Sequence, residues 1–182
     1  RHDGVSSSVP PVAFTDDPGR ALDGGWAGGT LLLTPSCRPL VGRPELTCLV
    51  ARELGHRRRR DRGRGILFAA AWYALAPPLA AALLAPDPGS PAQVVAALAA
   101  TATVWSWLGL LALPSLGRRQ AYAADRFWLE AGGDPGVLRD ALELLASRNL
   151  TERSRPVWVE RVFHPVPSLE NRLAAIDAWR GR

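Results

Sequence analysis

The residues with the most chemical promise lie in one short stretch, Arg52-Glu53-Leu54-Gly55-His56. On a helix, residues three or four positions apart differ in direction by only about 40 to 60°, so positions 52, 53 and 56 share one face. Histidine in place of Arg52 would complete H-E-x-x-H, in which two imidazoles bind Zn²⁺ and the glutamate reaches the metal-bound water. Arginine is not deprotonated in proteins and cannot replace the first ligand. A complete site would also need a third ligand from another element.

These residues lie on a predicted helix that begins at Pro44. Proline suits the first turn of a helix, and Glu45 favours its positive end. Apolar residues then recur three or four positions apart and form one stripe: Leu46, Leu49, Val50 and Leu54. Before this helix, the apolar run GTLLLTP (residues 29–35) predicts a buried strand. Residues 1–28 are rich in Gly, Pro, Ser and Asp, and we expect them to be irregular.

Two long uncharged runs follow the helix. Residues 66–85 reach about 30 Å at about 1.5 Å per residue, which matches the core of a bilayer. Residues 92–116 form a second run after the turn PDPGSP. Six arginines within residues 57–64 precede the first run, and two more follow the second. This pattern predicts a two-helix transmembrane hairpin with both ends cytoplasmic, kinked in its first span by a Pro-Pro pair. The alternative is a buried helical hairpin in a soluble protein.

Three further helices are expected downstream. The stretch RRQAYAADRFWLEAGG begins a separate helix that Gly132-Gly133 terminate, and Asp134 caps the next helix. Residues 154–168 are predicted to be a linker, and Ser168 to cap a last short helix. The chain therefore divides into an irregular segment (1–28), a strand with the R-E-L-G-H helix (29–64), the hairpin (65–117), and a helical part of the same domain (118–182).

The charge and cysteine content of the chain indicate which classes of partner and which cellular compartment to expect. The chain carries 22 basic and 17 acidic residues, and every basic residue is arginine. An arginine block directly before an apolar span favours a topology signal or an anionic-lipid contact over phosphate recognition, so we expect no nucleic-acid partner. Cys37 and Cys48 are expected to be free thiols in a reducing compartment, with a single disulfide as the alternative. The absence of methionine favours a processed or excised segment, and the N-terminus shows no signal-peptide pattern.

Four features in order make the chain similar to a known family. They are R-E-L-G-H with an aspartate five residues later, the apolar hairpin, A-Y-A-A-D, and H-P-x-P-x-x-E-N-R. From Gly29 to the C-terminus this order resembles the integral-membrane zinc metallopeptidases of the HtpX and CAAX prenyl protease type. That family has H-E-x-x-H-x-x-x-x-D, a membrane hairpin, E-x-x-A-D and a late His-Pro segment. The resemblance implies a mainly α fold with a small β element (α+β), a zincin-like core with an inserted two-helix transmembrane hairpin.

The resemblance assigns roles by position. Glu53 matches the general base, and His56 matches the second zinc ligand. Asp61 and Asp125 match family acids, with Asp125 expected beside a metal ligand. His164 matches the late histidine that approaches the substrate and would help to stabilise the oxyanion in an active enzyme.

Further positions belong to the substrate cleft or depart from the pattern. Arg172 matches an arginine that could reach the cleft. Arg52 stands where the family has its first ligand, and Ala121 where the family has its glutamate ligand. Two of three zinc ligands are therefore replaced, and we expect zinc to be absent or weakly bound.

The resemblance and the departures together predict a membrane-bound metalloendopeptidase homologue without catalytic activity, a pseudopeptidase that keeps a polypeptide-binding groove facing the cytoplasm. Its expected partners are the lipid bilayer and a polypeptide substrate or partner protein. Arg52 would either fill the former metal position and pair with Glu53 and Asp125, or extend to solvent. The alternative function is an active zinc metalloendopeptidase with non-standard ligands, such as Cys48, His56 and Asp125.

Overall fold

The computed structural model describes residues 11–15, 24–85, 87 and 89–181. Helices dominate the described chain, and a small sheet accompanies them, as predicted. The elements are β1 (Val12–Phe14), β2 (Gly24–Ala27), β3 (Thr30–Leu33), the 3₁₀ helix η1 (Pro35–Leu40), α1 (Pro44–Arg58), α2 (Asp61–Ala74), α3 (Ala76–Leu84), α4 (Pro91–Glu130), α5 (Pro135–Arg148), α6 (Val157–Phe163) and α7 (Leu169–Arg180).

The sheet has the strand order β1-β3-β2, with β1 parallel and β2 antiparallel to β3. The strand predicted within residues 29–35 is confirmed as β3, whose Leu31 and Leu33 are buried. The prediction of an irregular segment over residues 1–28 was wrong for β1 and β2. Both are short edge strands that pair only with β3, so their own sequence carries little strand signal. Residues 1–10 and 16–23 lie outside the described chain.

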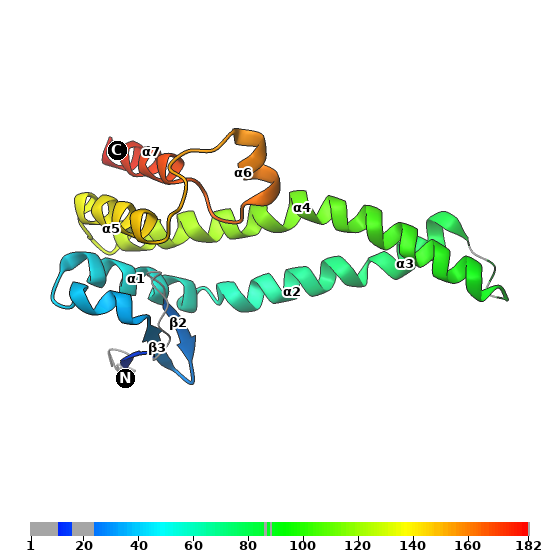
Figure 1. The fold of residues 1–182 in the computed structure, drawn as a ribbon, viewed down its shortest axis with the longest axis horizontal. Coiled ribbons are helices and arrows are strands. Elements are labelled where there is room, and N and C mark those ends of the chain that lie inside the picture. Colours follow the sequence, from blue (N-terminus) through cyan, green and yellow to red (C-terminus); the bar gives the residue numbers. More distant parts are fainter. Residues whose placement is uncertain (1–10, 16–23, 86, 88, 182) are drawn as a thin grey trace, which may run out of the picture.

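The hairpin extends away from the other elements, with α2 and α3 running alongside α4 (Figure 1). The two helical stretches Asp61–Leu84 and Pro91–Glu130 are long and apolar enough to cross a membrane, and their apolar windows are only 6% and 11% buried. The first stretch breaks at Leu75, between α2 and α3. The kink predicted at Pro77-Pro78 is thus confirmed, since a proline removes a helical N–H and its ring clashes with the carbonyl four residues earlier.

Two helix boundaries differ from the sequence-based expectation. No separate helix begins near Arg118. Instead α4 is one helix of 40 residues that runs through Arg118 and contains Pro114. The predicted linker of residues 154–168 contains α6, a helix of seven residues that Pro156 precedes. A helix this short gives too few apolar repeats to be recognised by periodicity.

The predicted starts of the last two long helices are confirmed at Asp134 and Ser168. The Asp134 side chain accepts a hydrogen bond of 2.7 Å from the Gly136 backbone N–H, as a capping residue does. Ser168 makes no such side-chain bond. Its backbone N–H instead donates to Oε2 of Glu160 at 3.0 Å, so α6 supplies the carboxylate at the start of α7.

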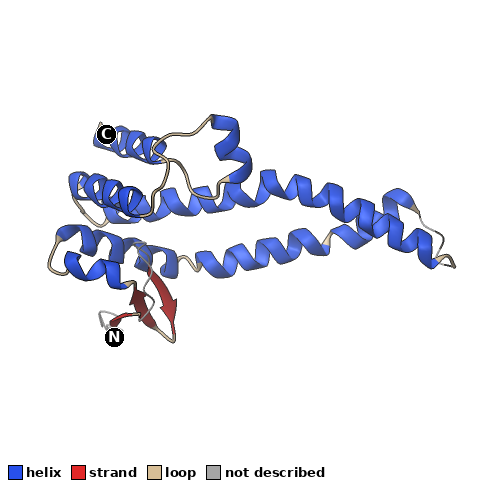
Figure 2. Ribbon diagram, in the orientation of Figure 1, coloured by secondary structure: helices blue, strands red, loops and turns tan. Residues whose placement is uncertain are grey.

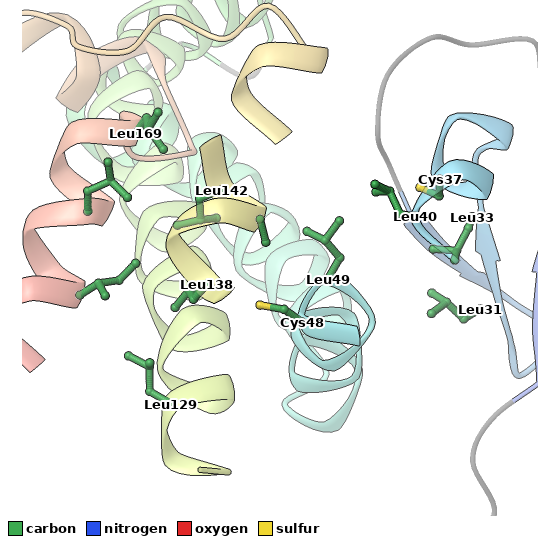
Figure 3. Close-up of a cluster of buried hydrophobic side chains, with 13 residues drawn as sticks. Leu31, Leu33, Cys37, Leu40, Cys48, Leu49, Leu129, Leu138, Leu142 and Leu169 are labelled. Atoms are coloured by element: carbon green, nitrogen blue, oxygen red, sulfur yellow. The ribbon is translucent and has the colours of Figure 1, made fainter. Parts of the chain in front are cut away.

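The buried core is arranged around α1, which lies between the sheet and helices α5 and α7 (Figure 2). Figure 3 shows Leu49 and Cys48 of α1 facing Leu138 and Leu142 of α5. A second group lies at the sheet and η1: Leu31, Leu33, Cys37 and Leu40. Both cysteines are free and buried, as expected from their number. This packing leaves the remaining face of α1 to the candidate site.

Candidate functional site

A cavity of about 330 Å³ brings together the chemically promising residues from distant parts of the chain. We call it the site cavity. Arg52, Glu53 and His56 line it from α1, Ala121 lines it from α4, and Arg172 from α7. The one-face arrangement expected from helical spacing is therefore present. Four of the five positions that the resemblance singled out on α1 and α4 line the site cavity, and the fifth, Asp125, bonds to one of them, Arg52.

Close packing of α1 on α4 creates this arrangement. Gly55 lies on the contact face of α1, where an added Cβ would be 3.0 Å from ring atoms of Phe127. Glycine permits this approach because it carries no side chain. Arg52 lies three residues before Gly55 on the same face of α1, and its Nε reaches Oδ1 of Asp125 on α4 at 2.7 Å.

Asp125 is held between two buried guanidiniums. Its Oδ1 accepts from Nε of Arg52 at 2.7 Å and from Nη2 of Arg172 at 2.6 Å, and its Oδ2 accepts from Nε of Arg172 at 2.8 Å. The three residues are exposed by only 8% (Arg52), 5% (Asp125) and 5% (Arg172). Arg52 thus pairs with Asp125 inside the protein and does not extend to solvent.

Electrostatics keeps this triad charged. Asp125 lies beyond the apolar run of residues 92–116, on the part of α4 that packs against the core. Burial by itself would raise the pKa of Asp125, but Arg52 and Arg172 hold that pKa below its usual value. Burial and the positive charge of Arg52 lower the pKa of Arg172. Arginine nevertheless stays protonated in proteins, so the triad carries two positive charges and one negative charge at neutral pH.

His56 has its own carboxylate partner. Its Nδ1 lies 2.7 Å from Oδ2 of Asp61, a buried residue that also accepts from Nη2 of Arg59 at 2.9 Å. Burial lowers the pKa of His56, and Arg52 lowers it further, against the opposing effect of Asp61. The ring is therefore neutral at pH 7. Because a carboxylate only accepts hydrogen bonds, Nδ1 carries the proton and Nε2 is left as the acceptor.

The side chains around the site cavity do not fit a zinc ion. Arg52 and Ala121 offer no lone pair, and Asp125 uses both oxygens on arginines. Cys48 is fully buried in the hydrophobic core and does not line the site cavity, so its sulfur is not presented to an ion there. Within the described residues, no three His, Cys, Asp or Glu side chains, Cys48, His56 and Asp125 included, form a group that could hold a metal ion.

The late histidine is placed differently from the expectation. Pro165 and Val166 line the site cavity, whereas His164, the residue before them, does not. The backbone carbonyl of His164 accepts from Nη1 of Arg118 at 2.9 Å, a bond that ties the end of α6 to α4. Arg172, by contrast, lines the site cavity as expected, although its guanidinium is committed to Asp125.

Sequence reasoning missed two polar residues of the site cavity. Gln120 and Asn149 both line it, and Nε2 of Gln120 donates to the backbone carbonyl of Asp61 at 3.0 Å. Gln120 directly precedes Ala121 on α4, so its position next to the expected ligand position could have indicated that it lines the site cavity. Asn149 follows the last turn of α5, and only the packing of α5 against α1 brings it to the site cavity.

Comparisons with known proteins found a matching family and a similar solved structure. The family model described as Peptidase family M48 matches residues 23–180. Among solved structures, the crystal structure of S. mikatae Ste24p is similar with a TM-score of 0.70 at 16% sequence identity. The likeness covers 91% of this chain and 44% of the Ste24p chain, so this chain spans less than half of that protein. At this identity the likeness shows a shared fold. No curated protein matches the chain.

Proposed function

Because the chain belongs to peptidase family M48, we propose that it is a membrane-embedded peptidase homologue that binds polypeptide without hydrolysing it. The observation that carries the proposal is the buried Arg52 at the first ligand position, fixed by Asp125 at 2.7 Å. A metal ion and this guanidinium cannot share the space. The loss of the glutamate ligand at Ala121 removes a second coordination point on the opposite wall of the site cavity.

Charge balance explains why such a replacement is tolerated. A Zn²⁺ ion with one glutamate and two neutral imidazoles has a summed charge of +1. Arg52, neutral His56 and Ala121 also sum to +1. If residue 52 were apolar, Asp125 would keep Arg172 as its counter-ion but would lose one of its three charge-assisted hydrogen bonds, at a cost of about 1–3 kcal/mol. Arginine at position 52 therefore supports the fold after the metal is lost.

The proposed polypeptide groove is the site cavity itself. Its polar lining includes Glu53, Gln120 and Asn149, and apolar surface comes from Leu33 and Val166. Amide and carboxylate groups of this kind bind the N–H and C=O groups of an extended peptide. In this proposal Glu53 acts as a binding residue and not as a general base, since no metal-bound water is present for it to deprotonate.

We also propose that the hairpin crosses the bilayer. Its outward side chains are apolar and exposed, among them Ile66 (63%), Leu67 (71%), Leu83 (74%) and Val104 (62%). A bilayer would cover these surfaces, which water would disfavour. In this proposal both ends of the hairpin, and with them the site cavity, lie on the cytoplasmic side; the arginines before α2 and at positions 118 and 119 support this orientation, because basic residues are enriched in cytoplasmic segments.

The double variant Arg52→His/Ala121→Glu tests the proposal. It restores the ligand types of the family, so the purified full chain should bind one equivalent of zinc and cleave an unfolded protein in a reaction that o-phenanthroline stops. The wild-type chain should do neither. Metal content is measured by mass spectrometry of the purified protein, and cleavage by gel assay.

Two control variants make the result specific. Arg52→His/Ala123→Glu places the new carboxylate two residues along α4, off the site cavity, and should bind less than stoichiometric zinc. Adding Glu53→Gln to the restored variant should keep zinc and abolish cleavage. Stoichiometric zinc with o-phenanthroline-sensitive cleavage in the wild type would refute the inactive assignment. A restored variant without zinc would refute the assignment of positions 52 and 121.

A further inference from the structure

A second, more open cavity of about 1070 Å³ lies where α1 gives way to α2, against α4. We call it the arginine pocket. Among the described residues that line it, Glu130 is the only acidic one. Five arginines also line it: Arg58, Arg59, Arg60, Arg64 and Arg126. The first four follow one another closely in sequence, but Arg126 comes from α4, more than sixty residues later. The positive charge is therefore assembled by the fold as well as by the arginine run.

Most of these cations are available to a ligand. Arg58, Arg60, Arg64 and Arg126 are exposed, and none of them forms an ion pair within the part of the chain that the structure describes. Arg59 differs, because Nη2 binds Asp61 and Nη1 donates to the Ala123 carbonyl at 2.9 Å.

The turn between α1 and α2 gathers these side chains. Arg60 has left-handed backbone angles (φ 54°, ψ 38°), which are disfavoured for residues other than glycine. This turn ends α1 at Arg58 and starts α2 at Asp61. As a result, arginines from the last turn of α1 and the first turn of α2 face the same cavity as Arg126.

The arginine pocket also has an apolar side. Leu67 and Phe127 line it, and Leu67 is 71% exposed. Leu67 belongs to the start of the apolar run that forms the hairpin. The pocket therefore joins a cluster of cations to the apolar surface at the base of α2. With the hairpin in a bilayer, this is the depth of the lipid headgroups.

We propose that the arginine pocket binds the phosphate headgroup of an anionic membrane phospholipid, with the acyl chains along the exposed face of α2. The inference rests on the proposed membrane hairpin. Arginine pairs with phosphate oxygens through two parallel hydrogen bonds, and a lipid supplies both the phosphate and the hydrocarbon that this lining requires. A nucleic acid or a free phosphate ion would match the arginines but would leave Leu67 and Phe127 without a partner.

Lipid binding to the purified full chain tests the proposal. The chain in detergent is titrated with phosphatidylglycerol and, separately, phosphatidylcholine, and bound lipid is counted by native mass spectrometry. Each basic side chain close to an anionic lipid strengthens binding by roughly five-fold. We expect phosphatidylglycerol to bind at least about ten-fold more tightly than phosphatidylcholine. The variant Arg58→Gln/Arg60→Gln/Arg64→Gln/Arg126→Gln should lose this preference.

A matched variant separates the pocket from overall charge. Arg148→Gln/Arg153→Gln/Arg161→Gln/Arg180→Gln removes four exposed arginines elsewhere and should keep the preference. Equal losses in both variants would overturn the proposal. Should the pocket variant fail to fold, Arg64→Gln is compared with Arg62→Gln, an exposed neighbour that does not line the pocket, and an equal effect of the two overturns it as well.

Two further measurements separate the pocket from other ligands and from the hairpin. Inorganic phosphate or a short oligonucleotide that displaces phosphatidylglycerol at equal concentration would overturn a lipid site. Flotation with vesicles of phosphatidylcholine alone tests membrane insertion. A chain that floats but shows no preference for phosphatidylglycerol refutes the pocket and leaves the hairpin intact. A chain that does not float refutes the hairpin, and the lipid site with it.

Discussion

Replacement of Asp125 by asparagine should destabilise the protein more than any other single change around the site cavity. The carboxylate makes three charge-assisted hydrogen bonds, one to Arg52 and two to Arg172, at 2.6 to 2.8 Å. Asparagine is close in size, so the packing is kept while the negative charge is lost. Two buried guanidiniums would then face each other without a counter-ion, and the asparagine N–H₂ group would add a donor where only donors are present.

The expected magnitude follows from this uncompensated charge. Removal of one partner from a buried ion pair costs about 3–5 kcal/mol. In a protein of this size about 1 kcal/mol shifts the thermal midpoint by roughly 2–4 °C, so Asp125→Asn should lower the midpoint by on the order of 10 °C. Arg52→Met should cost less, about 1–3 kcal/mol, because Asp125 keeps both bonds to Arg172 and the repulsion between the guanidiniums disappears.

The assay is thermal unfolding of the full chain in one detergent at one scan rate, followed by circular dichroism. Asp177→Asn is the matched control, because it removes an aspartate–arginine pair of similar geometry that is solvent-exposed: Asp177 accepts from Arg139 at 2.6 Å. Its effect should be close to zero. The order of destabilisation should be Asp125→Asn, then Arg52→Met, then Asp177→Asn.

The pH dependence provides a second test of the same triad. The folded-state pKa of Asp125 lies below its ordinary value of 3.8, so its contribution to stability is present above that pH and is lost only as the pH falls through the folded value. The difference between wild type and Asp125→Asn should thus be constant from about pH 5 to pH 8 and narrow in stronger acid. Equal midpoints for Asp125→Asn and Asp177→Asn at pH 7 would refute the buried triad.

Three further outcomes are expected. Gly55→Ala should cost about 1–3 kcal/mol, because its Cβ meets the Phe127 ring at 3.0 Å, whereas Gly65→Ala, with open space around the Cβ, should be neutral or slightly stabilising in the same melting assay. The Cys48 thiol, whose pKa burial raises to about 12, should resist thiol reagents at about pH 8 in the folded chain and react after unfolding; rapid labelling of the native chain, detected by peptide mass spectrometry, would contradict its burial. Burial lowers the pKa of His56, so the unfolded state takes up the proton first and stability falls as the pH drops below about 6.5; His56→Gln should remove this part of the pH dependence in melts, and an unchanged slope would disprove it.

The local part of the site could be predicted from the sequence, and the long-range part could not. Helical periodicity placed Arg52, Glu53 and His56 on one face, and the A-Y-A-A-D pattern placed Ala121 near them. The first inference needs only the 3.6-residue repeat, whereas the second is what the resemblance to the metallopeptidase family implies. The bonds of Asp125 to an arginine 47 residues later required the folded structure, since no local rule selects a partner over that distance.

One helix boundary that was predicted wrongly, near Arg118 in α4, affects how the apolar span is connected to the site cavity. The sequence-based prediction ended the apolar span at Arg118 and Arg119 and began a separate helix there, whereas α4 runs through both arginines and contains Pro114. Proline is tolerated where neighbouring groups compensate for its missing hydrogen bond, and the helix continues.

Continuity joins the proposed membrane anchor and the site cavity in one rigid element. Helical rise places Ala121 about 7 Å and Asp125 about 13 Å beyond the end of the apolar run at residue 116. The cavity is then held at a set height above the bilayer surface, within reach of a polypeptide that lies along or leaves the membrane. Arg118 of α4 donates to the backbone carbonyls of Glu160 and His164 at 3.0 and 2.9 Å. These bonds fix α6 to the same helix. The wall of the cavity formed by Pro165 and Val166 is therefore positioned by α4 and does not depend on a metal ion to keep its place.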